Sequence, residues 1–115
     1  MNDSFGAPNG YILQPVSTGS NSDIGYSLAI DKNDKILLGG YCRDTTINKY
    51  AFCIARFNPN GSLDTSFGTG GYKTISITSG NDYAYSLAIQ PNGNILLGGT
   101  CNNGSNYDFC IARFK

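Results

Sequence analysis

Apolar residues occur in short runs separated by turn-forming residues, and nearly every run occurs twice. Residues 26–42 read YSLAIDKNDKILLGGYC and residues 85–101 read YSLAIQPNGNILLGGTC, with 12 identities in 17 positions at an offset of 59. The run YAFCIARF (50–57) returns as YDFCIARF (107–114), with 7 identities in 8. A long internal period of this kind is typical of stacked or ringed structural units.

Each repeat is expected to hold four short strands, because its apolar runs alternate with turns rich in Asn, Gly and Pro. Apolar side chains occupy both faces of the third run, so both faces should be covered. The paired glycines of ILLGG fit a bulge or a close approach of another backbone. The expected strands are 26–30, 36–40, 52–57 and about 71–77, then 85–89, 95–99 and 109–114, with 10–13 matching the fourth strand.

Four-stranded antiparallel units with two apolar faces predict an all-β fold of β-propeller blades, two per chain. A small β-sandwich of about eight strands is the alternative, but the halves of a sandwich need not match in sequence. Residues 1–115 then form a single two-repeat unit. Its expected parts are the fourth strand of a neighbouring blade (2–16), repeat one (24–78) and repeat two (83–115).

The strings NPNGSLDTSFGTGGYKT, YAYSLAIQPNGNILLGG and YDFCIARF resemble the delta-sixty repeat, and the resemblance covers essentially the whole chain in two copies. The resemblance implies a β-propeller-like fold and bacterial, often secreted or surface, proteins built from long repeat arrays. It implies no enzymatic activity. This chain differs in having only two repeats and in having Cys where the family has small residues.

Charge and composition remove several classes of function. The formal net charge is zero and the basic residues are scattered, which argues against nucleic-acid partners. No apolar run is long enough for membrane insertion. No signal peptide is visible at the N-terminus, which favours a cytoplasmic location, whereas the family resemblance favours a secreted or surface one. His is absent and no catalytic motif is found, so we predict no enzyme, no catalytic residue, no cofactor and no metal site.

The four cysteines sit at repeated positions, namely Cys42, Cys53, Cys101 and Cys110. In each copy the two cysteines flank a hairpin loop, so they should lie side by side across that hairpin. Disulfides and adjacent free thiols are both open. The missing secretion signal favours free thiols, and the absence of CxxC pairs disfavours zinc.

Recurring charged residues are candidates for structural ion pairs. Two arginines, Arg56 and Arg113, lie in otherwise apolar strands and need acceptors. The carboxylates at matched positions are Asp3 with Asp64, and Asp23 with Asp82. Because both arginines recur, a structural contact in each blade is favoured over a ligand-binding role.

Four tyrosines are candidates for ligand stacking, namely Tyr26, Tyr83, Tyr85 and Tyr107. Packing in the core or at an interface is the favoured role for most of these rings. The function that we expect is a non-catalytic scaffold or binding module that presents loops to a protein or glycan partner. A glycan-binding lectin is the first alternative, and an enzyme is the least favoured.

Two blades cannot close a ring, so the chain is expected to be its own partner. The N-terminal strand of one chain can complete the C-terminal blade of the next, which is a head-to-tail contact. A homotrimer of six blades is preferred and a tetramer of eight is the alternative, since propellers usually have about 4–8 blades.

Overall fold

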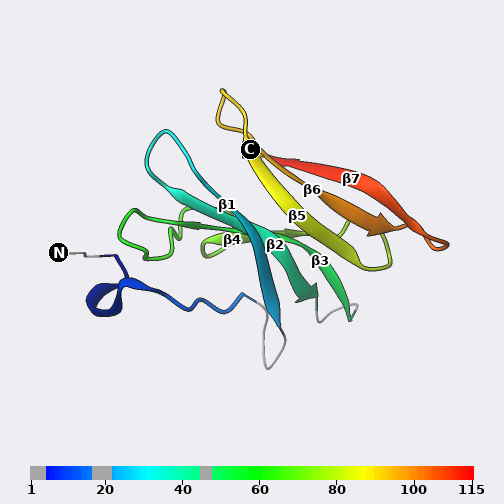
Figure 1. Ribbon diagram of the computed structural model, residues 1–115, viewed down its shortest axis with the longest axis horizontal. Helices are drawn as coiled ribbons and strands as arrows, with labels where there is room; N and C mark the ends of the chain where they lie inside the picture. The colour runs from blue at the N-terminus through cyan, green and yellow to red at the C-terminus, as the bar shows by residue number, and fades with distance from the viewer. Residues whose placement is uncertain (1–4, 17–21, 45–47) are drawn as a thin grey trace.

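The computed structural model describes residues 5–16, 22–44 and 48–115, and within these ranges the regular secondary structure is almost entirely β-strand (Figure 1). An irregular helical turn, η1 (Gly6–Gly10), comes first and contains a cis peptide bond between Ala7 and Pro8. The strands are β1 (Asp23–Ile30), β2 (Ile36–Asp44), β3 (Lys49–Phe57), β4 (Tyr72–Ile75), β5 (Asp82–Ile89), β6 (Ile95–Asn102) and β7 (Tyr107–Phe114). No helix in the described ranges is long and apolar enough to cross a lipid bilayer.

The strands form two antiparallel sheets, one for each repeat. Blade one has the order β1-β2-β3-β4, and blade two has the order β5-β6-β7. The first hairpin of blade one turns at Asp31, whose Oδ1 accepts the backbone N–H groups of Asn33 and Lys35. Such a turn leaves the flanking apolar residues free to continue as paired strands.

A bulge occurs at the same place in the first strand of both blades. The register shifts between Gly25 and Ser27 in β1, and between Ala84 and Ser86 in β5. A Cβ atom on Gly40 would lie 1.9 Å from the carbonyl oxygen of Ile24, so this position needs glycine. The second glycine of each ILLGG pair is therefore explained by the bulge that crosses in front of it.

The two blades pack face to face around one shared core, with β5 lying against β1, β2 and β3. The buried residues of that core come from both blades: Leu37, Phe52, Ile54, Phe67, Ala84, Ile95, Leu97, Cys101, Ala112 and Phe114. The prediction of an all-β fold with antiparallel blades is confirmed, and blade one has the expected four strands whereas blade two has three among the described residues. The ring itself is not closed by a single chain.

The strand expected at 10–13 is not formed. Residues 6–10 form η1, and residues 11–16 belong to no described strand. A strand needs the edge of another strand to pair with. The counterpart of these residues in blade one, β4, pairs with β3, and the counterpart of β3 in blade two is β7. β7 lies on the opposite side of blade one from the N-terminal segment (Figure 1), so the segment has no suitable edge within its own chain.

Candidate assembly faces and a tyrosine cluster

The contact between the blades depends on a glycine. A Cβ on Gly39 of β2 would lie 2.6 Å from Leu97 Cδ1 and 3.1 Å from Leu87 Cδ1, so only glycine lets the leucines of blade two come this close. Phe52 and Ile54 of β3 lie on the same face as Gly39 and are 0% and 1% exposed. Blade two thus covers the central part of this face of blade one, at Phe52 and Ile54.

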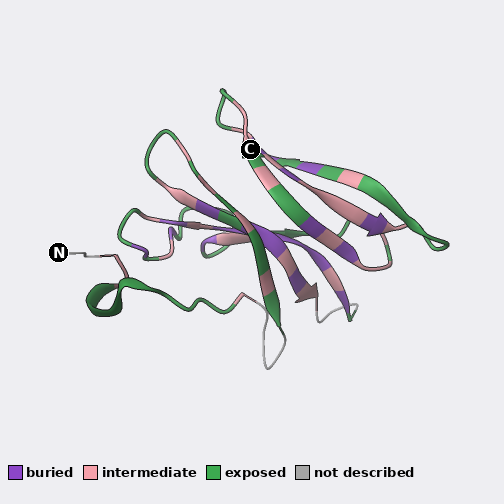
Figure 2. Cartoon of the chain, viewed as in Figure 1, coloured by how far each residue is buried: buried purple, intermediate pink, exposed green. Residues whose placement is uncertain are grey.

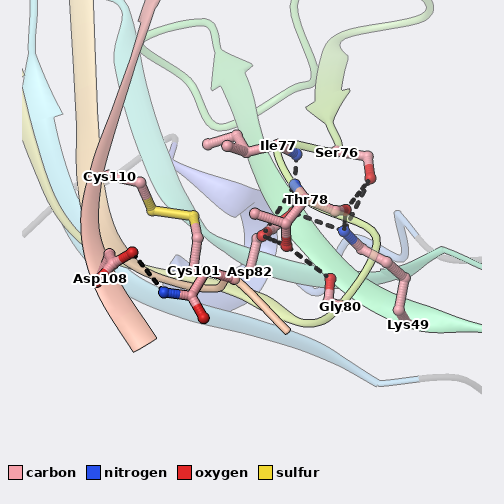
Figure 3. Close-up of a disulfide and its surroundings, with 10 residues drawn as sticks. Lys49, Ser76, Ile77, Thr78, Gly80, Asp82, Cys101, Asp108 and Cys110 are labelled. Carbon is pink, nitrogen blue, oxygen red and sulfur yellow. Dashed lines mark hydrogen bonds and ion pairs between the residues drawn. A yellow bond between two sulfur atoms is a disulfide. The ribbon is translucent and has the colours of Figure 1, made fainter. Parts of the chain in front are cut away.

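A buried ion pair joins the blades beside this contact. Lys49 Nζ, at the start of β3, lies 2.6 Å from Asp82 Oδ2 at the start of β5. Lys49 also donates to Ser76 Oγ and to the Thr78 carbonyl oxygen, and Ile77 N–H donates to Asp82 (Figure 3). We call this group the Lys49–Asp82 latch, because it ties the end of blade one to the beginning of blade two.

The latch holds Asp82 in its charged form. Burial alone would raise the pKa of Asp82, but hydrogen bonds from Lys49, from the Thr78 hydroxyl and from backbone N–H groups outweigh it. The pKa of Asp82 is therefore lowered below its ordinary value. Every described polar contact of this carboxylate thus favours the ionised state on which the latch depends.

The corresponding face of blade two is open. Phe109 and Ile111 of β7 are the counterparts of Phe52 and Ile54, 57 residues later, yet they are 96% and 73% exposed. Figure 2 shows the contrast between the buried β3 and the largely exposed β7. A Cβ on Gly98, the counterpart of Gly39, would meet no leucine, and its nearest neighbour would be the Cys110 carbonyl oxygen at 3.8 Å.

The opposite face of blade one is also exposed, and it corresponds to the face of blade two that packs into the shared core. Leu28, Ile30 and Leu38 are exposed there, although their counterparts Leu87, Ile89 and Leu97 pack into the shared core. The N-terminal segment runs over part of this face, and the two together line a partly open pocket of about 300 Å³ whose lining is largely apolar. The two open faces are therefore the two halves of the interface that the blades already form within the chain.

Each pair of cysteines is joined by a disulfide within its own hairpin. Cys42 and Cys53 have Cα atoms 5.8 Å apart, and Cys101 and Cys110 have Cα atoms 6.0 Å apart. The structure thus differs from the free thiols that the sequence favoured. The reason is the register, which sets the two cysteines of each pair diagonally across neighbouring strands, within the span that a disulfide requires. Figure 3 shows the bond between Cys101 and Cys110.

The charged candidates are used in different ways. Arg56 Nε pairs with Asp64 Oδ2 at 2.9 Å, and Lys35 Nζ lies 3.2 Å from the same oxygen. A hydrogen bond from the Ser66 hydroxyl, followed by that from Lys35, lowers the pKa of Asp64. Arg113 is exposed on β7.

The remaining carboxylates differ from this pattern. Asp23 Oδ2 accepts the backbone N–H of Val16 at 2.7 Å, and Asp82 pairs with Lys49 rather than with an arginine. Asp3 lies outside the described residues. The ion pair expected for each arginine is therefore seen with its carboxylate only at Arg56, within the described part of the chain.

Six of the eight tyrosines form one continuous cluster across both blades. Its members are Tyr26, Tyr41, Tyr50, Tyr83, Tyr85 and Tyr107. Tyr26 and Tyr85 occupy the two bulges, and their ring centroids are 4.5 Å apart. A hydrogen bond with Tyr26, together with burial, raises the pKa of Tyr41 above its usual range. The four tyrosines predicted from sequence are thus brought together, and each keeps part of its surface in contact with solvent.

Family membership agrees with this geometry. The sequence matches a β-propeller domain of unknown function, DUF5122, over residues 32–67 and 90–115. The chain belongs to the DUF5122 β-propeller family. The first matched segment covers β2 and β3, and the second covers β6 and β7, so both blades of this propeller contribute to the match. No curated protein matches the chain.

Sequence reasoning missed one residue of this propeller, Lys49, and left the role of another, Gly39, open. Lys49 gave no signal, because the second repeat has Asn106 at the corresponding position and the repeat therefore hid it. Gly39 belongs to the ILLGG run that occurs twice, but the sequence did not indicate which of the two glycines lies at the bulge and which lies at the contact between the blades. Within the described ranges, no group of three or more acidic, Cys or His side chains is arranged to hold a metal ion.

Proposed function

We propose that this chain is a non-catalytic β-propeller module that assembles with copies of itself into a ring and presents loops to a protein or glycan partner. The observation that carries the proposal is the pair of open faces, which repeat the two halves of the blade interface. We also propose that its repeat is of the delta-sixty type, which the strings SLDTSFG and QPNGNILLGG support.

Burial supplies the driving force for assembly. Covering a side chain such as Phe109 or Ile111 contributes about 1.5–3 kcal/mol, and exposed apolar patches of this kind mark interaction sites. The two faces differ from each other, so the contact between copies is head-to-tail and closes into a ring only if the rotation per blade fits. Three copies provide six blades, which is our preferred ring, and four copies provide eight.

Gly98 offers a direct test, because it should matter only between copies. A Cβ atom at Gly98 would meet nothing closer than 3.8 Å within the chain, and valine suits a strand. In the ring, however, Gly98 would face Leu28 and Leu38 of the next copy, as Gly39 faces Leu87 and Leu97. We expect Gly98→Val to keep the fold and to abolish assembly.

Light scattering measures the outcome as mass. The wild type should give about 37 kDa for three chains of 12.3 kDa, and Gly98→Val should give the mass of one chain. Gly39→Val is the matched control, since it should unfold the single chain by driving Leu97 away. A wild type that stays monomeric at micromolar concentration would refute the ring, and an assembled Gly98→Val would refute this choice of faces.

Glycan binding by the tyrosine cluster is the second candidate. The bulges displace Tyr26 and Tyr85 from the regular strand pattern, and bulges often re-aim side chains at functional sites. Both rings are about half-exposed, which leaves surface for a sugar to contact. A glycan array with the wild type, the double variant Tyr26→Ala/Tyr85→Ala and the control Tyr72→Ala tests it. Binding that survives the double variant, or no binding at all, would remove this candidate.

A further inference from the structure

We propose that residues 11–14 form the fourth strand of blade two in a second copy of the chain. In this pairing Tyr11 of one copy lies opposite Ala112 of the other, and Leu13 lies opposite Cys110. The inference rests on the proposed ring and deepens it, because it names the strand, the edge and the register that join two copies.

The edge in question is the free side of β7. In blade one the equivalent side of β3 is covered by β4, with Ala55 opposite Tyr72 and Cys53 opposite Thr74. In blade two, β7 pairs only with β6 among the described strands. A strand edge of this kind is a ready template for another strand.

The internal repeat identifies the segment that fits this edge. Gly10-Tyr11 corresponds to Gly71-Tyr72, 61 residues later, and β3 corresponds to β7 at an offset of 57. Transferring the β3–β4 register by these two offsets gives the pairs Ala112–Tyr11, Ile111–Ile12, Cys110–Leu13 and Phe109–Gln14.

The N-terminal segment resembles β4 in the backbone of Tyr11 and in a hydrogen bond at Val16. Tyr11 is extended, with φ −145° and ψ 163°. Val16 N–H donates to Asp23 Oδ2 at 2.7 Å, as its counterpart Ile77 N–H donates to Asp82 Oδ2 at 2.8 Å. The segment thus enters blade one as β4 enters blade two.

The side chains of this segment are exposed where a partner strand would lie. Leu13 is 92% exposed and Tyr11 is mostly exposed. The β7 of the same chain lies beyond the other side of blade one (Figure 1), so it cannot pair with this segment. In a head-to-tail assembly, blade two of a second copy would pack on blade one, as blade one packs on blade two within the chain. This would bring the β7 of the second copy to the N-terminal segment.

A disulfide trap tests the register. Arg56 N–H donates to Gly71 O at 3.0 Å, which makes Ala55–Tyr72 a non-hydrogen-bonded pair, the kind in which side chains are closest. The chain Tyr11→Cys and the chain Ala112→Cys, purified separately, are mixed and oxidised. Non-reducing electrophoresis and peptide mapping then detect the cross-link between residues 11 and 112.

We expect a covalent heterodimer only in the mixture, and loss of that band when Ile12→Cys replaces Tyr11→Cys, since this moves the thiol by one residue to the other face. A cross-link at residue 12 instead of 11 would overturn the register. Assembly of the expected mass without a cross-link at either residue would overturn strand exchange but leave the ring standing. A monomeric wild type would overturn both.

A pair of proline variants provides a test that needs no new thiol. In the proposed ladder the N–H of Ile12 donates to Ile111 O of the other copy, whereas the N–H of Leu13 points away. Proline cannot donate to a ladder, and residue 12 is outside the strands of the single chain. We expect Ile12→Pro to cause a loss of assembly and Leu13→Pro to leave it largely intact. Equal assembly of both variants would overturn the proposal.

Discussion

Blade one and blade two have nearly the same third strand but opposite surroundings. FCIARF in β3 is buried on both faces, whereas the same letters in β7 leave Phe109 and Ile111 exposed. The difference cannot come from the strand itself, because the residues are identical. The neighbouring blade therefore determines which residues of this strand are buried, and the apolar sequence of β7 is typical of a strand that is covered on both faces.

The largest expected effect separates the two phenylalanines. Phe52→Ala should lower the free energy of unfolding of the single chain by about 3–5 kcal/mol, because it leaves a cavity in a tightly packed core. Phe109→Ala should change it by less than about 0.5 kcal/mol, as expected for an exposed side chain, but should weaken assembly. Urea unfolding below the assembly concentration measures both. Equal costs would mean that β7 is covered in the single chain.

Most of the strands in both blades could be predicted from the sequence, whereas the N-terminal strand and the Lys49–Asp82 latch could not. The repeated apolar runs place seven of the expected strands, because a strand with two apolar faces needs little context to be recognised. The strand at 10–13 was not formed, since strand formation depends on an edge that its own chain does not offer. The latch was not predicted for a different reason. Lys49 stands at one of the positions at which the repeats differ, and a repeat pattern indicates only the residues that the copies share.

The next effect tests the latch that joins the blades. Lys49→Met should lower the free energy of unfolding by about 3–5 kcal/mol, because it leaves the buried Asp82 carboxylate without its cation. The double variant Lys49→Met/Asp82→Asn should recover part of the loss, since it removes the charge that lost its partner. Thermal or urea unfolding of the four chains of this cycle checks the coupling. A double variant as unstable as the sum of the singles would show that the two residues act independently.

The latch also predicts how stability depends on pH. The pKa of Asp82 is lower in the folded chain than in the unfolded chain, so its contribution is present above the unfolded value and is lost as pH falls toward the folded one. The free energy of unfolding should therefore decrease below about pH 4. Asp82→Asn should show a shallower decrease over the same range. An unchanged slope would exclude the latch as its source.

The two disulfides should differ in how readily they are reduced. Each closes a short loop, with sequence separations of 11 and 9 residues, and so contributes about 2–3 kcal/mol. Cys42 and Cys53 are both buried, whereas Cys110 is only partly buried. In the single chain, reductant should therefore open Cys101–Cys110 first, as alkylation and mass spectrometry would show. Simultaneous opening of both bonds in the single chain would contradict this account. In the ring, by contrast, segment 11–14 of another copy should cover Cys110 and slow its reduction.

The smallest effect concerns the junction between copies. Within the chain Lys49 reaches Asp82, but at the proposed junction the counterpart of Lys49 is Asn106 and the counterpart of Asp82 is Asp23. Asn106→Lys should therefore place at this junction the ammonium group that Lys49 provides within the chain. A partly exposed ion pair contributes up to about 1 kcal/mol, so the concentration for half-assembly should fall several-fold in dilution experiments followed by light scattering. Because the gain is electrostatic, it should shrink as salt is raised. Asn103→Lys, on the same loop but not at the matched position, is the control, and an equal gain from it would mean that added charge, rather than a second latch, tightens the ring.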